Sequence, residues 1–111
     1  MTEIYNLIQV NEPVEVAYAE ERANLKVATF INERPAPGGR EILSTGSIRN
    51  CTDLISAFVT EESQRRPDMG SHIFYTLGVN YIRNGSSVNF RVMWKHTSNG
   101  THKAYVTVLY R

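Results

Sequence analysis

The sequence has little cysteine and no long apolar run, and both absences restrict the class of protein. One cysteine cannot form an internal disulfide, so nothing points to an oxidising compartment. No apolar stretch approaches the roughly 20 residues that a membrane-spanning helix needs. The opening residues, MTEIYNLIQV, carry an acid and no basic cluster before an apolar run, so we expect no secretory signal there. We expect a cytoplasmic or nuclear protein without a membrane partner.

Catalytic motifs are also absent. The chain has no glycine-rich phosphate loop and no G-x-S-x-G nucleophile motif. Cys51 lies among apolar residues, where a small buried side chain is the usual occupant. His96 and His102 flank the Asn99-Gly100 turn without an acidic third ligand nearby, so we expect surface histidines there and no metal site. We predict that the protein is not an enzyme and holds no cofactor.

The 111 residues are enough for one core and one domain, residues 1–111. Hydrophobic residues make up 41% and charged residues 21%, which is typical of a globular chain. The net charge of +1 conceals an asymmetry. Residues 1–63 hold five basic residues against ten acids, whereas residues 64–111 hold seven against one. A basic half with interspersed aromatic residues suits a nucleic-acid surface, and the other interpretation is a dipolar domain whose ends meet in a dimer.

The stretch from Arg40 to Pro67 predicts a strand, a glycine turn and a helix. Residues 41–45 alternate as a short strand that Gly46 ends. Ser47 or Asn50 can cap a helix whose apolar stripe is Leu54, Ile55, Phe58 and Val59. The start of such a helix can hold a phosphate. The other interpretation is an ordinary strand-to-helix connection packed on a sheet.

Residues 14–33 fit two patterns. Apolar residues at helical spacing, together with several alanines, predict a helix. The alternation of Leu25, Val27, Thr29 and Ile31 instead favours two strands joined by a hairpin through residues 19–24. We choose the helix because its stripe spans more residues. Before it, residues 4–10 predict a strand, and after it the prolines and glycines of residues 34–40 predict a loop.

The C-terminal third predicts a three-strand antiparallel meander. Residues 72–82 form its first strand, and Asn84-Gly85 supplies a type I′ turn. Val88, Phe90, Val92 and Trp94 then share one face, which we expect to be core. Asn89, Arg91, Met93 and Lys95 lie on the other face. After Asn99-Gly100, the last strand places Ala104, Val106, Val108 and Tyr110 together.

These elements give an α+β fold, a β-α-β-α-β-β(-β) two-layer sandwich. If residues 14–33 are strands, the alternative is a single long helix on a curved antiparallel sheet, as in cystatin-like or nuclear transport factor 2-like half-barrels. The strand at residues 6–10, the segment from Glu41 through Gly46 to Ile48 with the following helix, and the closing strand at residues 103–108 resemble the Alba family of small nucleic-acid-binding proteins.

The resemblance implies a dimer, either homodimer or heterodimer, that binds DNA or RNA without catalysis. It also implies that the hairpin at residues 83–87 reaches toward the nucleic-acid backbone. Two departures stand out: the loop after the first strand carries Glu12 where Alba proteins usually have lysine, and Gly46 has no basic neighbour. The predicted nucleic-acid-binding residues are Arg40, Arg49, Arg83, Asn84, Ser86, Ser87, Arg91, Lys95 and Lys103. The alternative function is a protein-interaction or assembly module, such as a viral or phage accessory or structural subunit.

Overall fold

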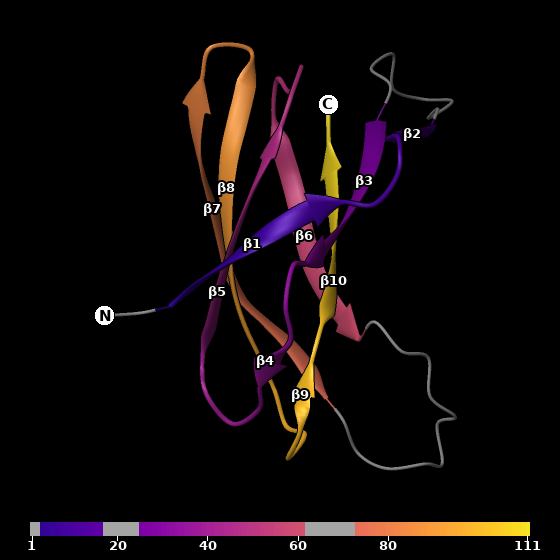
Figure 1. Cartoon of the computed structure of the whole chain (residues 1–111). Coiled ribbons are helices and arrows are strands. Elements are labelled where there is room, and N and C mark those ends of the chain that lie inside the picture. Colours follow the sequence, from indigo (N-terminus) through magenta and orange to yellow (C-terminus); the bar gives the residue numbers. More distant parts are fainter. Residues whose placement is uncertain (1–2, 17–24, 62–72) are drawn as a thin grey trace.

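The computed structural model describes residues 3–16, 25–61 and 73–111, and these residues form strands and connections without a helix (Figure 1). No helix able to span a bilayer occurs in this part of the chain. The strands are β1 (Ile4–Gln9), β2 (Val14–Val16), β3 (Leu25–Asn32), β4 (Ala36–Pro37), β5 (Ile42–Ile48), β6 (Leu54–Glu61), β7 (Phe74–Asn84), β8 (Ser87–His96), β9 (Thr101–His102) and β10 (Ala104–Tyr110).

One curved sheet contains most of these strands, in the order β6-β10-β3-β1-β5-β8-β7, with β2 paired to β3. The β1–β5 pair is parallel and the other pairs are antiparallel. The sheet curls until its two ends meet: the amide of Val59 on β6 donates a 2.9 Å hydrogen bond to Thr76 Oγ1 on β7. The result is a nearly closed barrel. The short strands β4 and β9 pair with each other at its lower end in Figure 1.

The inward faces of β8 and β10 form the centre of the core, as the alternation predicts. Val88, Phe90, Val92 and Trp94 are fully buried, and so are Ala104, Val106 and Val108 on β10. Phe30 on β3 meets Phe90 edge-on, with ring centroids 5.2 Å apart. Burying these side chains on both halves of the barrel is the main stabilising contribution to the fold.

The predicted helix over residues 14–33 is wrong. β2 and β3 pair there as antiparallel strands, with Val14 opposite Val27 and Val16 opposite Leu25. The hairpin alternative is therefore correct for the pairing, while its connection at residues 17–24 lies outside the described residues. The helical spacing arose because β3 carries apolar side chains on both faces: Phe30 points inward and Ile31 outward.

The predicted helix over residues 54–59 is also wrong, since β6 occupies the segment. Ala57 and Val59 are buried against the core, whereas Ile55 and Phe58 are exposed. Apolar residues on both faces of this strand again imitated a helical stripe. The α+β class is overturned, and so is its alternative with one long helix. The anion site that we expected at a helix start has no helix to support it.

Gly46 does not end the strand, because β5 continues through it to Ile48. The side chains around position 46 leave no room for a residue larger than glycine. A Cβ placed on Gly46 would lie 2.7 Å from the Phe90 ring and 3.3 Å from Leu7 Cβ. The glycine therefore admits the ring of Phe90 against the backbone of β5.

The predicted meander is only partly right. β7 and β8 form the expected hairpin, but its loop is Gly85-Ser86, because Asn84 pairs with Ser87. Gly85 has a φ of 65° and Ser86 does not have a positive φ, which fits a type II′ turn in place of type I′. β8 and β10 do not pair, since β10 lies between β3 and β6.

The loop at residues 34–40 contains the short strand β4, contrary to expectation.

Candidate nucleic-acid interface

The nine predicted binding residues do not form one surface. Arg91 and Lys95 lie on the outward side of β8, between β5 and β7. Lys103 precedes β10 and lies on the other half of the barrel, between β3 and β6. Arg40 precedes β5 and Arg49 follows it. The remaining four residues lie at the β7–β8 hairpin end, with Arg83 and Asn84 at the end of β7, Ser86 in the loop and Ser87 at the start of β8.

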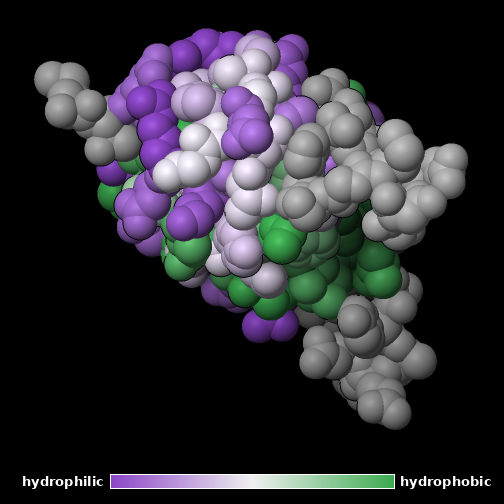
Figure 2. Space-filling view, turned by 90° about the horizontal axis from the view of Figure 1, so that it is seen from below, coloured by the Kyte–Doolittle hydropathy of each residue, from purple (hydrophilic) through white to green (hydrophobic). Residues whose placement is uncertain are grey.

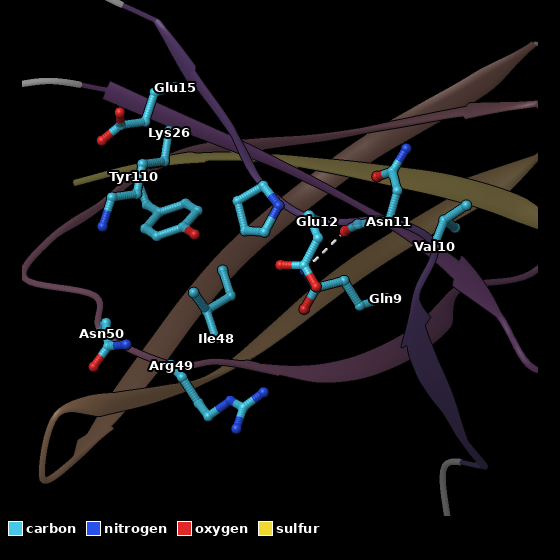
Figure 3. Close-up of a pocket in the computed structure, with 11 residues that line it drawn as sticks. Gln9, Val10, Asn11, Glu12, Glu15, Lys26, Ile48, Arg49, Asn50 and Tyr110 are labelled. Carbon is cyan, nitrogen blue, oxygen red and sulfur yellow. Dashed lines mark hydrogen bonds between the residues drawn. The ribbon is translucent and has the colours of Figure 1, made fainter.

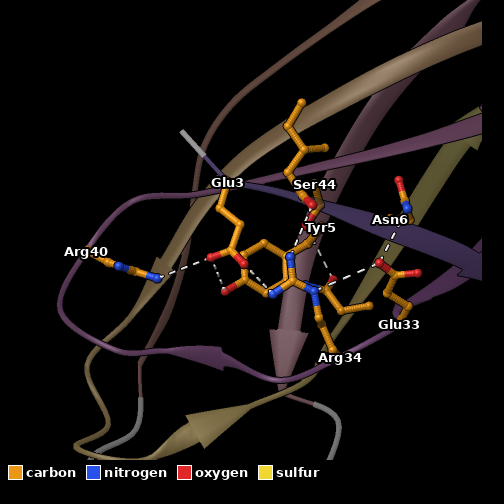
Figure 4. Close-up of polar contacts among 9 residues, drawn as sticks. Glu3, Tyr5, Asn6, Glu33, Arg34, Arg40 and Ser44 are labelled. Atoms are coloured by element: carbon orange, nitrogen blue, oxygen red, sulfur yellow. Dashed lines mark hydrogen bonds and ion pairs between the residues drawn. The ribbon is translucent and has the colours of Figure 1, made fainter. Parts of the chain in front are cut away.

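Arg40 belongs to an ion-pair cluster at the N-terminal end of the barrel (Figure 4). Glu3 lies 3.7 Å from Arg40 and 2.6 Å from Arg34. Arg34 also stacks over the Tyr5 ring at 4.0 Å, and its hydrogen bond with Glu3 raises its pKa. Arg40 is thus partly neutralised by an acid, and the structure gives it a role in attaching the first strand.

Arg83 joins two elements of the barrel. Its guanidinium donates one hydrogen bond to the carbonyl of Cys51, at 2.7 Å, and a second to the carbonyl of Thr52. The amide of Cys51 in turn donates to the carbonyl of Ser86 at 3.1 Å. These bonds attach the β7–β8 turn to the β5–β6 connection. The guanidinium is therefore a structural clamp at the seam of the barrel.

A largely polar surface lies on the outward side of β5, β8 and β7. Arg91 stands directly between Thr45 and Asn80, and Asn89 stands between Ser47 and Ile82. We define the polar face as Thr45, Ser47, Asn80, Asn89, Arg91 and Lys95.

The polar face carries two cations, Arg91 and Lys95. Within residues 3–16, 25–61 and 73–111, neither Arg91 nor Lys95 forms an ion pair, and Arg91 is exposed. One apolar row, Leu43 and Met93, crosses the polar face between Arg91 and Lys95. Tyr75, 41% exposed, is the neighbour of Lys95 on β7. Cations, amides and an aromatic ring on one open sheet can contact phosphates and bases.

The sequence contained a signal for the neutral members of this face. Asn80 and Asn89 occur within strands that are otherwise rich in β-branched and aromatic residues, although asparagine is depleted in strands. The pairing of distant strands decided the rest of the face. Ile42 on β5 pairs with Trp94 on β8, and Ile48 pairs with Val88, and local patterns do not encode that pairing.

A pocket of about 610 Å³ opens at the end of the barrel next to Arg49 (Figure 3). The β1–β2 connection forms one wall, and Ile48, Asn50 and Tyr110 form another. Lys26 lies over the Tyr110 ring at 5.7 Å and faces Glu15 across the β2–β3 pair. The pocket holds both acids and bases, so it does not select ligands by charge sign.

Cys51 follows Asn50, which lines the pocket, and is only 3% exposed. Burial raises the pKa of its thiol, which Arg83 lowers to a smaller extent. Because the thiolate is the nucleophilic form, the raised pKa makes Cys51 a poor nucleophile near neutral pH.

Neither histidine is exposed at the surface, contrary to expectation. His96 is fully buried; its Nδ1 accepts the Ser98 amide at 3.2 Å, so its Nε2 carries the proton and donates to the Ala36 carbonyl at 2.8 Å. His102 Nε2 lies 2.7 Å from Ser98 Oγ, and Glu61 lies 3.9 Å from His102 Nδ1. This order of serine, histidine and acid is that of a hydrolase triad, but Ser98 is 8% exposed and its hydroxyl also accepts the Gly100 amide. We interpret the cluster as support for the β8–β9 connection.

No family model, no curated protein and no solved structure matches the chain. The resemblance to Alba stays a prediction from short motifs, and the α+β fold that it implies is not the fold of this chain. The geometry of the chain's own residues is the basis on which its function is inferred.

Proposed function

We propose that the protein binds single-stranded nucleic acid on the polar face. The observation that supports this most is the pair Arg91 and Lys95, two cations on one strand that have no acidic partner among the described residues. An unpaired cation on an open surface is the group that releases counterions when it meets a phosphate. Asn80, Asn89 and Thr45 add hydrogen-bonding groups beside Arg91.

The spacing of these groups suits a strand lying along the sheet. Arg91 and Lys95 are four residues apart on β8, which is about 13 Å along a strand. The neighbours of Arg91 lie about 5 Å away on either side. Leu43 and Met93 between the two cations, and Tyr75 beside Lys95, offer apolar and aromatic contacts for bases.

A single strand fits this surface better than a duplex. The outer side of a barrel is convex, and the described residues include no helix that could enter a major groove. Exposed bases of a single strand can lie flat on a sheet and stack on aromatic rings. Small barrels that bind oligonucleotides across their strands provide an analogy at the level of fold.

The test is fluorescence anisotropy with a labelled single strand of about twelve nucleotides, as RNA and as DNA, and with the matching duplexes. We expect binding that weakens steeply between about 50 and 200 mM salt. In the variant R91E/K95E, affinity for the single strand should fall at least about tenfold, and the salt slope should decrease by about 1.4 for two lost contacts.

The control is K26E/K103E, which changes the net charge by the same amount on the other half of the barrel, where β3 and β10 lie. Its affinity should stay within about threefold of wild type, since only long-range attraction is altered. Equal losses in the two double variants would show a response to net charge alone and would contradict the polar face as the site. Absence of wild-type binding at low salt would overturn the function itself.

A further inference from the structure

The half of the barrel opposite the polar face has a surface of its own, and this second surface carries no charged side chain. It is formed by the outward sides of β1, β2, β3, β10 and β6. Cross-strand pairing places its residues in three rows, namely Ile8-Ile31-Tyr105-Thr60, Val10-Thr29-Thr107-Phe58 and Val14-Val27-Leu109-Ser56. We call these twelve residues the apolar face.

The margins of the apolar face are open to solvent. Val14 is 61% exposed, Ile8 54%, Phe58 48% and Val10 47%. Figure 2 shows hydrophobic residues gathered on the right of the molecule, where β3 and β10 lie in Figure 1, while hydrophilic residues cover the upper left. Apolar side chains that remain in water at this density mark a contact surface.

The area of the face suits a weak association. Four strands about 4.8 Å apart and three rows about 6.7 Å apart cover roughly 400 Å². Two such faces bury roughly 800 Å² of flat sheet area, and the buried surface area is somewhat larger because side chains project from the sheet. This is the size of transient interfaces, below the roughly 1,600 Å² of standard stable complexes. An occupant should therefore bind in the micromolar range or more weakly.

We propose that the apolar face docks a second copy of this chain, face to face about a two-fold axis. A face without charge opposes its own copy without like-charge repulsion, and it offers no cation to a phosphate backbone. The middle row fits such an axis: a two-fold axis through the centre of the face sets Thr29 against Thr107 of the other copy and Phe58 against Val10 of the other copy.

The dimer would leave the polar face accessible on both copies, because β5, β8 and β7 are outside the contact. The affinity of self-association and the affinity for nucleic acid should therefore depend differently on salt concentration. Binding at the polar face weakens as salt rises, whereas apolar association is unaffected or strengthened. The dimer does not depend on the proposed nucleic-acid function.

The test is sedimentation equilibrium of the whole chain from about 1 µM to 1 mM, the range in which weak dimers dissociate. Wild type should change from the monomer mass of 12.6 kDa toward twice that value. Phe58→Asp puts a charge in the middle row and should raise the dissociation constant at least about tenfold. Ile82→Asp is the control, since Ile82 is 72% exposed on β7 and outside the apolar face.

Four outcomes decide the proposal. A concentration-dependent dimer that Phe58→Asp weakens and Ile82→Asp leaves intact supports it. Wild type that stays monomeric throughout overturns it, and so does a dimer that both variants retain or that only Ile82→Asp disrupts. If Phe58→Asp does not fold, Ile8→Glu on the same face replaces it, because Ile8 is 54% exposed and should tolerate the change.

Discussion

Trp94 and Ser44 form a hydrogen bond inside the barrel: the indole N–H donates to Ser44 Oγ at 2.9 Å, and both residues are fully buried. The hydroxyl of Ser44 donates onward to Asn32 Oδ1 at 3.4 Å. The bond links β8 to β5 through side chains, in addition to the backbone pairing of these strands. It also gives the largest core side chain its polar partner, which a buried tryptophan needs.

Replacing Ser44 by alanine should therefore destabilise the fold. The indole N–H of Trp94 would stay buried without an acceptor, at a cost of about 1–3 kcal/mol. Urea unfolding followed by tryptophan fluorescence measures the change. Ser47→Ala on the same strand is the matched control, because Ser47 is exposed and should change stability by less than about 0.5 kcal/mol. Equal midpoints for the two variants would show that the bond contributes nothing.

A second prediction concerns two glycines that differ in their surroundings. A Cβ at position 46 would lie 2.7 Å from the buried Phe90 ring, whereas a Cβ at position 78 would have no atom within 4 Å. Gly46→Ala should cost about 1–3 kcal/mol by forcing this ring to move, while Gly78→Ala should be close to neutral. Thermal unfolding of both variants is the measurement. If Gly78→Ala is the more damaging change, the close contact at Phe90 is not what requires glycine.

The third prediction is a loss of stability in alkali. Burial raises the pKa of the Cys51 thiol and of the Tyr110 phenol, so both groups stay neutral in the folded chain after they begin to ionise in the unfolded chain. Their contribution is complete below about pH 8.5, where an unfolded cysteine begins to ionise, and is lost as pH rises through the higher folded pKa values.

The urea midpoint should therefore fall between about pH 8 and pH 10.5. Cys51→Ala removes the thiol and should make the fall less steep. A midpoint whose pH dependence is the same in wild type and in Cys51→Ala would show that the buried thiol is not coupled to folding.

The fourth prediction follows from the Arg83 clamp. Arg83→Ala removes the donors to the carbonyls of Cys51 and Thr52 and should let the seam of the barrel open more often. Since the guanidinium is exposed and competes with water, we expect a loss of about 1 kcal/mol and roughly fivefold faster labelling of Cys51 by a thiol reagent. Arg91→Ala, on the open face of β8, should leave the labelling rate unchanged. Equal rates in wild type and Arg83→Ala would contradict the clamp.

β8 and β10 could be predicted from local pattern because on each strand buried residues alternate with less buried ones. On β8, Phe90 and Trp94 alternate with Asn89 and Arg91, so the period of two is plain, and the structure confirms it. The candidate interface was predictable only in part. Arg91 and Lys95 stand on it, but Arg40 pairs with Glu3 and Arg83 binds backbone carbonyls.

The segments that were predicted wrongly share one property. β3 and β6 carry apolar residues on both faces, and Phe58 and Ile31 on the outer side combined with Ala57 and Phe30 on the inner side to imitate a helix. Sequence reasoning assumes that exposed positions are polar. That assumption fails where a strand presents an apolar outer surface, which is the surface that we propose for self-association.

The sequence by itself determined the inward residues of β8 and β10 and the position of Trp94, because alternation is a local property of a strand. The tertiary structure alone decided which strands are neighbours: β10 between β3 and β6, and β5 beside β8. Such pairings join residues far apart in the chain and depend on how the whole sheet curls, a cooperative outcome that no short window contains. The same pairings brought Arg91 between Thr45 and Asn80 and separated it from Lys103.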